Sequence, residues 1–243
     1  MNFNLLIARV LRKYFNFCEW DYKLFGIVGN EKTTLRATIA EIYPVGGYSY
    51  PIIKPKTIID LGSNIGVSVK YFKKEFGDDV KVICVEPNNY NLVYLKKNIA
   101  DCWNVFVLNN LIASMKGFGS RIDVSECTTS YSYKINDEGV VRAITMNDII
   151  TNFALTSVDL VKIDIEGAEY DLLLNNNKWL DISRDLFIEF HGANESLLDE
   201  SFKLLFKKGF FLRGTSSGIC WFSKYKSNLV CGALHVNSEL HVN

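Results

Sequence analysis

From residue 57 onward, hydrophobic and polar positions follow two alternating rhythms along the chain. Short apolar runs rich in β-branched residues predict strands, and stretches with apolar residues three or four positions apart predict helices. The predicted strands are Thr57–Leu61, Lys81–Glu86, Val105–Leu111, Val158–Ile165, Leu186–His191, Phe210–Arg213 and Ile219–Ser223. The predicted helices lie near Gly66–Phe76, Asn89–Ala100, Ala168–Asn175 and Glu195–Phe206. Because strands and helices alternate, we expect an α/β fold with a mostly parallel sheet and helices on both faces.

The regions outside this alternation divide the chain into three parts. We expect residues 1–54 to form an N-terminal extension of helix and loop, residues 55–226 the main domain, and residues 227–243 a tail. Within the domain, the polar stretch 117–140 indicates a short β excursion or a flexible loop. The segment Gly214–Gly218 separates the last two strands closely, which predicts an antiparallel hairpin at one edge of the sheet.

The composition indicates which classes of partner and which cellular compartment to expect. The chain has 27 basic and 27 acidic residues, so it offers no basic field to a nucleic-acid backbone, and no nucleic-acid partner is expected. Six cysteines without a CxxC pair favour a reducing compartment. Because Arg9 and Arg12 interrupt the N-terminal apolar run, we expect neither a signal peptide nor a membrane-spanning helix, and a cytoplasmic protein. The spacing of Leu6, Val10 and Tyr14 predicts an amphipathic helix that packs on the domain, with a peripheral membrane contact or a homodimer as the alternative.

A glycine-bearing turn follows the first predicted strand. The segment Asp60–Gly66 is typical of a strand end, a turn and a helix start, an arrangement that lets backbone amides approach a nucleotide. Asn64 and Val67 stand where the second and third glycines of the dinucleotide fingerprint would fall. The turn therefore does not offer the close backbone approach that a pyrophosphate needs. Glu86 ends the second strand 24 residues after Gly62, the spacing of an acidic residue that holds a ribose diol. These features predict a nucleotide-like ligand without a pyrophosphate.

Charged side chains also occur inside two later predicted strands. Alternation places Lys162 and Asp164 on one face of the fourth strand, and Glu189 and His191 on one face of the fifth. If these strands are neighbours, we expect Lys162 to form a structural ion pair with Glu189, and Asp164 to lie beside His191 in an active site. Glu169 falls in the first turn of the next helix, where it caps the helix or contacts a ligand. Asp164, Glu189 and His191 are too few for a full ligand set, so no metal is expected.

Several of these motifs together resemble one known family. The turn Asp60–Gly66, the pair Glu86–Pro87, the block Lys162–Glu169 (KIDIEGAE) and the segment Glu189–Gly192 are similar to the FkbM family of S-adenosylmethionine-dependent methyltransferases, over about residues 55–215. The resemblance implies a Rossmann-like class I methyltransferase fold, with a seven-stranded mixed sheet of order 3-2-1-4-5-7-6 and an antiparallel seventh strand. It also implies a cofactor, S-adenosylmethionine, whose expected contacts are Asp60, Gly62, Ser63, Asn64, Gly66, Glu86, Pro87, Asn88, Ala113 and Asp164.

The resemblance further implies a reaction. We expect methyl transfer to a hydroxyl of a small-molecule or glycan acceptor, such as a sugar or a secondary metabolite. An alcohol must lose its proton as its oxygen attacks, and histidine has a near-neutral pKa, so His191 is predicted as the general base with Asp164 orienting it. Two alternatives remain open at this point: an NAD-dependent oxidoreductase of Rossmann type, and a non-catalytic binding protein that keeps the fold.

Overall fold

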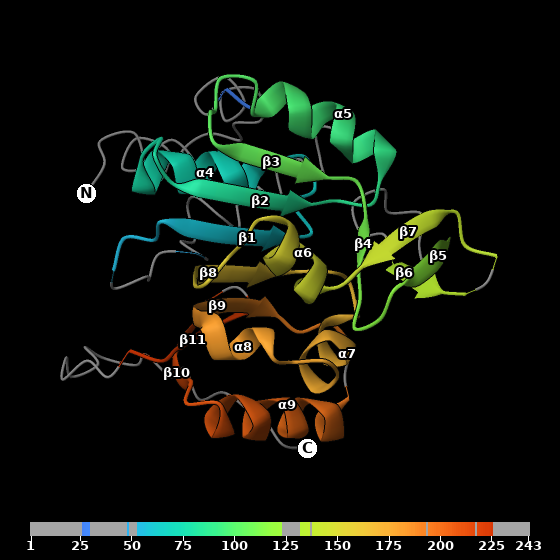
Figure 1. The fold of residues 1–243 in the computed structure, drawn as a ribbon, viewed down its shortest axis with the longest axis vertical. Coiled ribbons are helices and arrows are strands. Elements are labelled where there is room, and N and C mark those ends of the chain that lie inside the picture. The colour runs from blue at the N-terminus through green and yellow to red at the C-terminus, as the bar shows by residue number, and fades with distance from the viewer. Residues whose placement is uncertain are drawn as a thin grey trace, which may run out of the picture.

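A seven-stranded sheet forms the centre of the computed structural model (Figure 1). The structure describes residues 26–29, 48, 53–122, 132–136, 138–192, 194–216 and 218–225. The strands of this sheet are β1 (Thr57–Leu61), β2 (Lys81–Val85), β3 (Val105–Leu108), β8 (Val158–Ile163), β9 (Ser183–Glu189), β10 (Phe211–Ser216) and β11 (Ile219–Ser223). Each of them overlaps a strand that the sequence pattern predicts.

The sheet is mixed, as expected. Its order is β3-β2-β1-β8-β9-β11-β10, and β11 runs antiparallel to both of its neighbours while the other neighbouring pairs are parallel. These strand numbers differ from the expected order 3-2-1-4-5-7-6 because the strands of a second sheet lie between β3 and β8 along the chain. The predicted hairpin is confirmed, with a tighter turn, since β10 continues to Ser216.

Helices cover both faces of this sheet, which confirms the expected layering. One face packs against α4 (Val67–Phe76) and α5 (Asn89–Asn98), and the other against α6 (Met146–Asn152), α7 (Glu169–Leu174), α8 (Trp179–Ile182) and α9 (Glu195–Lys207). Successive side chains of a strand point to opposite faces of the sheet, so each strand packs against helices on both faces. Ile58 in β1 joins the buried cluster that includes Phe72 of α4, whereas Ile59 joins the cluster that includes Trp179 of α8. The short helices α6 and α8 were not predicted.

A second, four-stranded sheet lies beside the carboxyl ends of β1, β2 and β8 (Figure 1). Its strands are β4 (Leu111–Ile112), β5 (Gly117–Ile122), β6 (Ser132–Ile135) and β7 (Val141–Ile144), in the order β4-β7-β5-β6. Of the two interpretations of the polar stretch 117–140, the described residues show the β excursion, and it extends to β4 and β7 on either side. This sheet therefore faces the edge where ligands bind in open α/β folds.

Parts of the N-terminal extension that the structure describes pack on the α4 side of the sheet. The ring of Tyr48 is buried and lies 5.6 Å from the ring of Phe72 and 5.4 Å from that of Phe187. The side chain of Asn98 accepts from the amide of Val28 and donates to its carbonyl. The predicted amphipathic helix around Leu6 and the predicted tail fall outside the described residues. No helix within the described ranges has the length and apolar character needed to cross a bilayer.

Candidate active site

The turn after β1 brings two strands of the central sheet into backbone contact. Gly62 has a positive φ of 77°, and a Cβ atom there would lie 1.8 Å from the carbonyl oxygen of Asp164, so only glycine fits. The amides of Gly62 and Ser63 donate to the carbonyl of Val85 at 2.9 and 3.2 Å. Asn64 also takes a positive φ, of 48°. The turn is thereby fixed between the ends of β2 and β8.

Glu86 is a buried carboxylate that closes the turn from the β2 side. Its Oε2 accepts from the amide of Asn64 at 2.8 Å, and its Oε1 accepts from the amide of Asn88 at 2.9 Å and from the side chain of Asn91 at 3.3 Å. Burial raises the pKa of Glu86 to about 7, although these hydrogen bonds lower it. A carboxyl group with this pKa is only partly ionised at neutral pH, and further donors from a ligand favour its charged form.

A cavity of about 300 Å³ opens in front of the turn. It falls at the small end of the range for ligand pockets, about 300–1,000 Å³. The predicted cofactor residues that line the cavity are Gly62, Asn64, Glu86, Pro87, Ala113 and Asp164. Leu111 and Ile112 of β4 and residues Tyr133–Ile135 of β6 line it as well, so the second sheet forms one of its walls.

The other predicted cofactor residues do not line the cavity, so their contact with a cofactor stays a prediction, and each makes contacts that support the turn or α5. Asp60 is fully buried, and its Oδ2 accepts from the hydroxyl of Ser68 in α4 at 2.6 Å. The hydroxyl of Ser63 donates to the carbonyl of Asp60. Gly66 packs against α5, where a Cβ atom would lie 2.7 Å from a methyl group of Leu95. Asn88 caps α5 by accepting two of its first backbone amides.

Lys162 is buried where the turn, β1 and β8 meet. Its ammonium donates to the carbonyl of Gly62 at 2.7 Å, and lies 3.1 Å from Oδ2 of Asp164 and 3.4 Å from Oδ1 of Asp60. That Asp60 oxygen makes no hydrogen bond, so the ion pair is its compensation. Burial lowers the pKa of Lys162, but the charges around it, with Asp164 the strongest, raise the pKa well above its usual value.

The expected pairing of Lys162 with Glu189 is therefore wrong. Alternation put the two side chains on one face correctly, but the register pairs Lys162 with Phe187. Glu189 lies two residues further along β9, level with the residue after β8. The ion pairs of Lys162 run instead to Asp60 on the neighbouring strand β1 and to Asp164 on its own segment.

His191 follows β9 and is oriented by Glu169, in place of the expected Asp164. Nδ1 of the imidazole lies 3.0 Å from Oε1 of Glu169, a side chain with no exposed surface. The carboxylate of Glu169 also accepts from the amides of Ile165 and Gly167, at about 3 Å each. Glu169 begins α7 as predicted, but it folds back onto the loop before the helix instead of capping it alone. The loop that follows β8 and the end of β9 are thus joined through one buried carboxylate.

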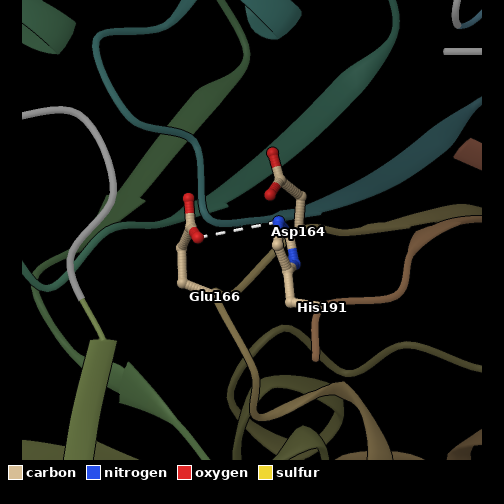
Figure 2. A group of neighbouring side chains, drawn as sticks. All are labelled: Asp164, Glu166 and His191. Carbon is tan, nitrogen blue, oxygen red and sulfur yellow. Dashed lines mark ion pairs between the residues drawn. The ribbon is translucent and has the colours of Figure 1, made fainter. Parts of the chain in front are cut away.

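Other carboxylates surround the outer edge of the same imidazole. Nε2 of His191 lies 3.6 Å from Oε2 of Glu166 (Figure 2), and it lies 3.7 Å from Oε1 of Glu189. The hydrogen bond to Glu169 raises the pKa of His191 to about 9 against the effect of burial, and the charges of Glu166 and Asp164 add to the rise. At neutral pH the imidazole is therefore protonated. A protonated imidazole cannot accept the proton of a hydroxyl. The general-base role of His191 therefore stays a prediction that requires the neutral imidazole.

A family model, described as the methyltransferase FkbM domain, matches residues 60–212. The chain belongs to the FkbM family of methyltransferases. The match begins at Asp60 near the end of β1 and covers the turn at Gly62, Glu86, the block Lys162–Glu169 and His191. The FkbM domain thus contains both the cavity and the carboxylates around the imidazole.

The structure is also similar to solved structures of other methyltransferases. Aeropyrum pernix fibrillarin with natively bound S-adenosylmethionine is 12% identical, with a TM-score of 0.47 over 76% of this chain and 74% of that chain. A methyltransferase from Geobacter sulfurreducens is 12% identical, with a TM-score of 0.45 over 90% and 95% of the two chains. A ribosomal protein L11 methylase from Lactobacillus delbrueckii subsp. bulgaricus is 11% identical, with a TM-score of 0.41 over 82% and 80%. No curated protein sequence matches the chain.

Sequence reasoning missed several residues of the FkbM domain that the structure brings to the site. Asn91 stands one helical turn after residue 88, and this spacing is a signal that could have found it. Glu166 lies inside the KIDIEGAE block, but the pattern gave it no partner. Residues Tyr133–Ile135 carry no local signal, because their place at the cavity depends on the pairing of β6 with β5.

Proposed function

We propose that the chain binds S-adenosylmethionine in the cavity beside Gly62 and transfers a methyl group to a hydroxyl of a small-molecule or glycan acceptor. The observation that carries this proposal is the convergence of Glu86 with the Gly62 turn in one cavity. A buried carboxylate with a raised pKa suits a ribose diol, because two hydroxyl donors restore the stabilisation that burial removes. A glycine whose Cβ would strike the opposite strand suits a backbone that must lie close to a ligand.

The residues of the lining divide between the parts of this cofactor. Glu86 holds the ribose hydroxyls, and the turn Gly62–Asn64 with Asp164 faces the amino acid part. The apolar side chains of Leu111 and Ala113 border the adenine, which has no charge to compensate. Lys162 fixes both the turn and Asp164, so it positions the residues that bind without lining the cavity itself.

S-adenosylmethionine, when bound, supplies an electrophilic methyl group, so the protein has to align the acceptor and remove its proton. We assign removal of the acceptor's proton to Glu189, a carboxylate that lies 3.7 Å from Nε2 of His191 and does not line the cofactor cavity. His191 and Asp164, expected as the base and its partner, are both part of the site. The imidazole of His191 lies beside Glu166 and Glu189, and Asp164 is held by Lys162.

Calorimetry with S-adenosylhomocysteine, the product form of the cofactor, tests the binding half of the proposal. We expect saturable binding that Glu86→Gln weakens by about tenfold or more, because a neutral amide accepts less strongly from a diol than a carboxylate does. Glu75→Gln, an exposed change in α4, is the matched control and should bind normally. Binding of NADH in its place would favour the oxidoreductase. No binding of either ligand at millimolar concentration would favour the non-catalytic protein.

The acceptor half is tested by transfer of a radiolabelled methyl group to a panel of sugars, glycans and phenolic metabolites. With an acceptor in hand, Glu189→Gln should lower turnover by about 10²–10⁴-fold, the usual contribution of a positioned base, without changing the affinity for S-adenosylhomocysteine. Full turnover in Glu189→Gln would remove Glu189 from the reaction and leave the cofactor assignment untouched.

A further inference from the structure

Three side chains converge at the edge of the cavity where the acceptor would meet the cofactor. Asp164 follows β8, Glu166 stands in the next loop, and His191 follows β9, and Figure 2 shows them gathered in one group. One carboxylate oxygen from each acid and one ring nitrogen of the histidine all lie within 4.8 Å of one another. Each side chain is between 27% and 29% exposed, so the group is open on one side and anchored on the other.

The spacing of these atoms suits a shared metal ion. Ligands about 2.1 Å from a tetrahedral metal ion lie about 3.4 Å from one another. Oε2 of Glu166 and Nε2 of His191 are 3.6 Å apart without any ion between them. Oδ2 of Asp164 lies 3.1 Å from the ammonium of Lys162, and one oxygen of the same carboxylate lies within 4.8 Å of the ligand atoms of Glu166 and His191. Small side-chain rotations would therefore complete a three-ligand site.

A second observation comes from behind the imidazole and lies outside the ligand group. Histidines that bind metal through one ring nitrogen donate the other N–H to a carboxylate or a carbonyl, which fixes the ring. Glu169 supplies such a carboxylate at Nδ1, at 3.0 Å, and it has no exposed surface. Because the amides of Ile165 and Gly167 hold Glu169 in turn, Nε2 is aimed at Glu166. This arrangement makes the group more than a collection of acidic side chains.

We propose that Asp164, Glu166 and His191 bind a divalent cation of the Mn²⁺ or Zn²⁺ class. Mixed carboxylate and imidazole ligands suit these ions better than Ca²⁺, which prefers oxygen ligands alone. Three protein ligands leave at least one position open for water or an acceptor oxygen, as in metal sites that take part in reactions. The sequence led us to expect no metal because Asp164, Glu189 and His191 fell short of a full ligand set. The structure adds Glu166, which groups with Asp164 and His191, while Glu189 lies 3.7 Å from Nε2 of His191. The use of the ion to hold an acceptor rests on the proposed methyl transfer, whereas binding of the ion does not.

Titration of the full-length chain with Mn²⁺, after removal of metals with EDTA, tests the proposal by calorimetry and by electron paramagnetic resonance. We expect one saturable site, and an affinity reduced by at least about tenfold in Glu166→Gln and in His191→Gln. Glu200→Gln, an exposed change in α9, is the control for surface charge and should bind Mn²⁺ normally. Thermal unfolding of each variant verifies that it is folded, and Glu166→Gln is the safer variant because Glu166 is in a partly exposed loop.

Two results would overturn the metal site: no saturable binding of Mn²⁺ or Zn²⁺ at millimolar concentration, or unchanged binding in both variants. Glu86→Gln separates this failure from that of the proposed function. It should weaken S-adenosylhomocysteine binding and leave Mn²⁺ binding intact, because Glu86 contacts Asn64, Asn88 and Asn91 and is not among the metal ligands. If S-adenosylhomocysteine binds normally to the metal-free chain and Mn²⁺ does not bind, the methyltransferase stands and the metal site falls.

Discussion

Glu86 and His191 stand beyond the carboxyl ends of β2 and β9, and they show how differently the two sides of the site are built. Glu86 is held by neutral donors, namely backbone amides and one side-chain amide. His191 is held by carboxylates on both ring nitrogens. Both pKa values are raised, to about 7 and about 9, but with opposite consequences. On the cofactor side, the charge of Glu86 is incompletely stabilised until a ligand arrives. On the acceptor side, the charge of His191 is stabilised by its carboxylate neighbours before any ligand binds.

The largest effect is expected where the two sides meet, at Lys162. Lys162→Met removes the ammonium that Asp60 and Asp164 share, so two carboxylates lose their ion pair and one of them is fully buried. Breaking a buried ion pair in this way costs about 3–5 kcal/mol of unfolding free energy, which urea denaturation measures. Lys70→Met is the control, because Lys70 pairs with an Asp101 side chain that is 73% exposed, and should lose less than about 1 kcal/mol. Equal losses in the two variants would mean that Lys162 does not join the two sides.

Gly62→Ala should damage the cofactor side next most strongly. The new Cβ would lie 1.8 Å from the carbonyl of Asp164, and a φ of 77° strains any L side chain. We expect a loss of about 3 kcal/mol of stability and of S-adenosylhomocysteine binding, measured by urea denaturation and calorimetry. Gly209→Ala has a similar φ of 84° with nothing within 4 Å of the added carbon, so it carries the strain without the clash. Normal ligand binding by Gly62→Ala would show that the close approach of the strands is dispensable.

A smaller effect should distinguish the two sides by pH. The pKa of Glu86 is raised to about 7 in the ligand-free protein, and a ribose diol binds best to its charged form. Affinity for S-adenosylhomocysteine should therefore rise by about tenfold between pH 6 and pH 8 and then level off. Glu86→Gln should make the profile flat over this range.

Folding stability should move the opposite way, because the folded pKa of Glu86 lies above the usual value of 4.5. Between these two pKa values the folded state binds more protons than the unfolded state, so this residue's contribution to the stability of the ligand-free protein falls as pH rises from about 4.5 to 7. Comparing urea denaturation of the native chain and Glu86→Gln across this range isolates that contribution. A flat difference between the two would contradict the raised pKa.

The cofactor side could be predicted from sequence because its signals are local. Short apolar runs rich in β-branched residues identified β1 and β2, and the spacing from Gly62 to Glu86 indicated two residues that meet in the cavity. The second sheet could not be predicted in the same way. β4 has two residues, too few to show alternation, and β6 reaches the cavity only through its pairing with β5.

On the acceptor side, the residues could be predicted but their partners could not. Alternation brought Asp164 and His191 to the same edge, and the structure places them in one group. The partner of His191 depends on how the loop after β8 folds back so that Glu169 reaches Nδ1, and no spacing along the chain reveals that. The pairing of Lys162 with Asp60 depends on the register of β8 with β1, which places these two residues opposite each other. Long-range pairing, rather than local pattern, decides the chemistry here.

The position of Lys162 also limits how this sequence can vary. One ammonium serves the turn after β1, a carboxylate inside β1 and a carboxylate after β8, so replacing the lysine alone leaves buried charges without compensation. Viable variation at this point has to change Lys162, Asp60 and Asp164 together, which single-step mutation seldom achieves. A library meant to redirect the enzyme to new acceptors would keep these three positions constant and diversify the loop that carries Glu166.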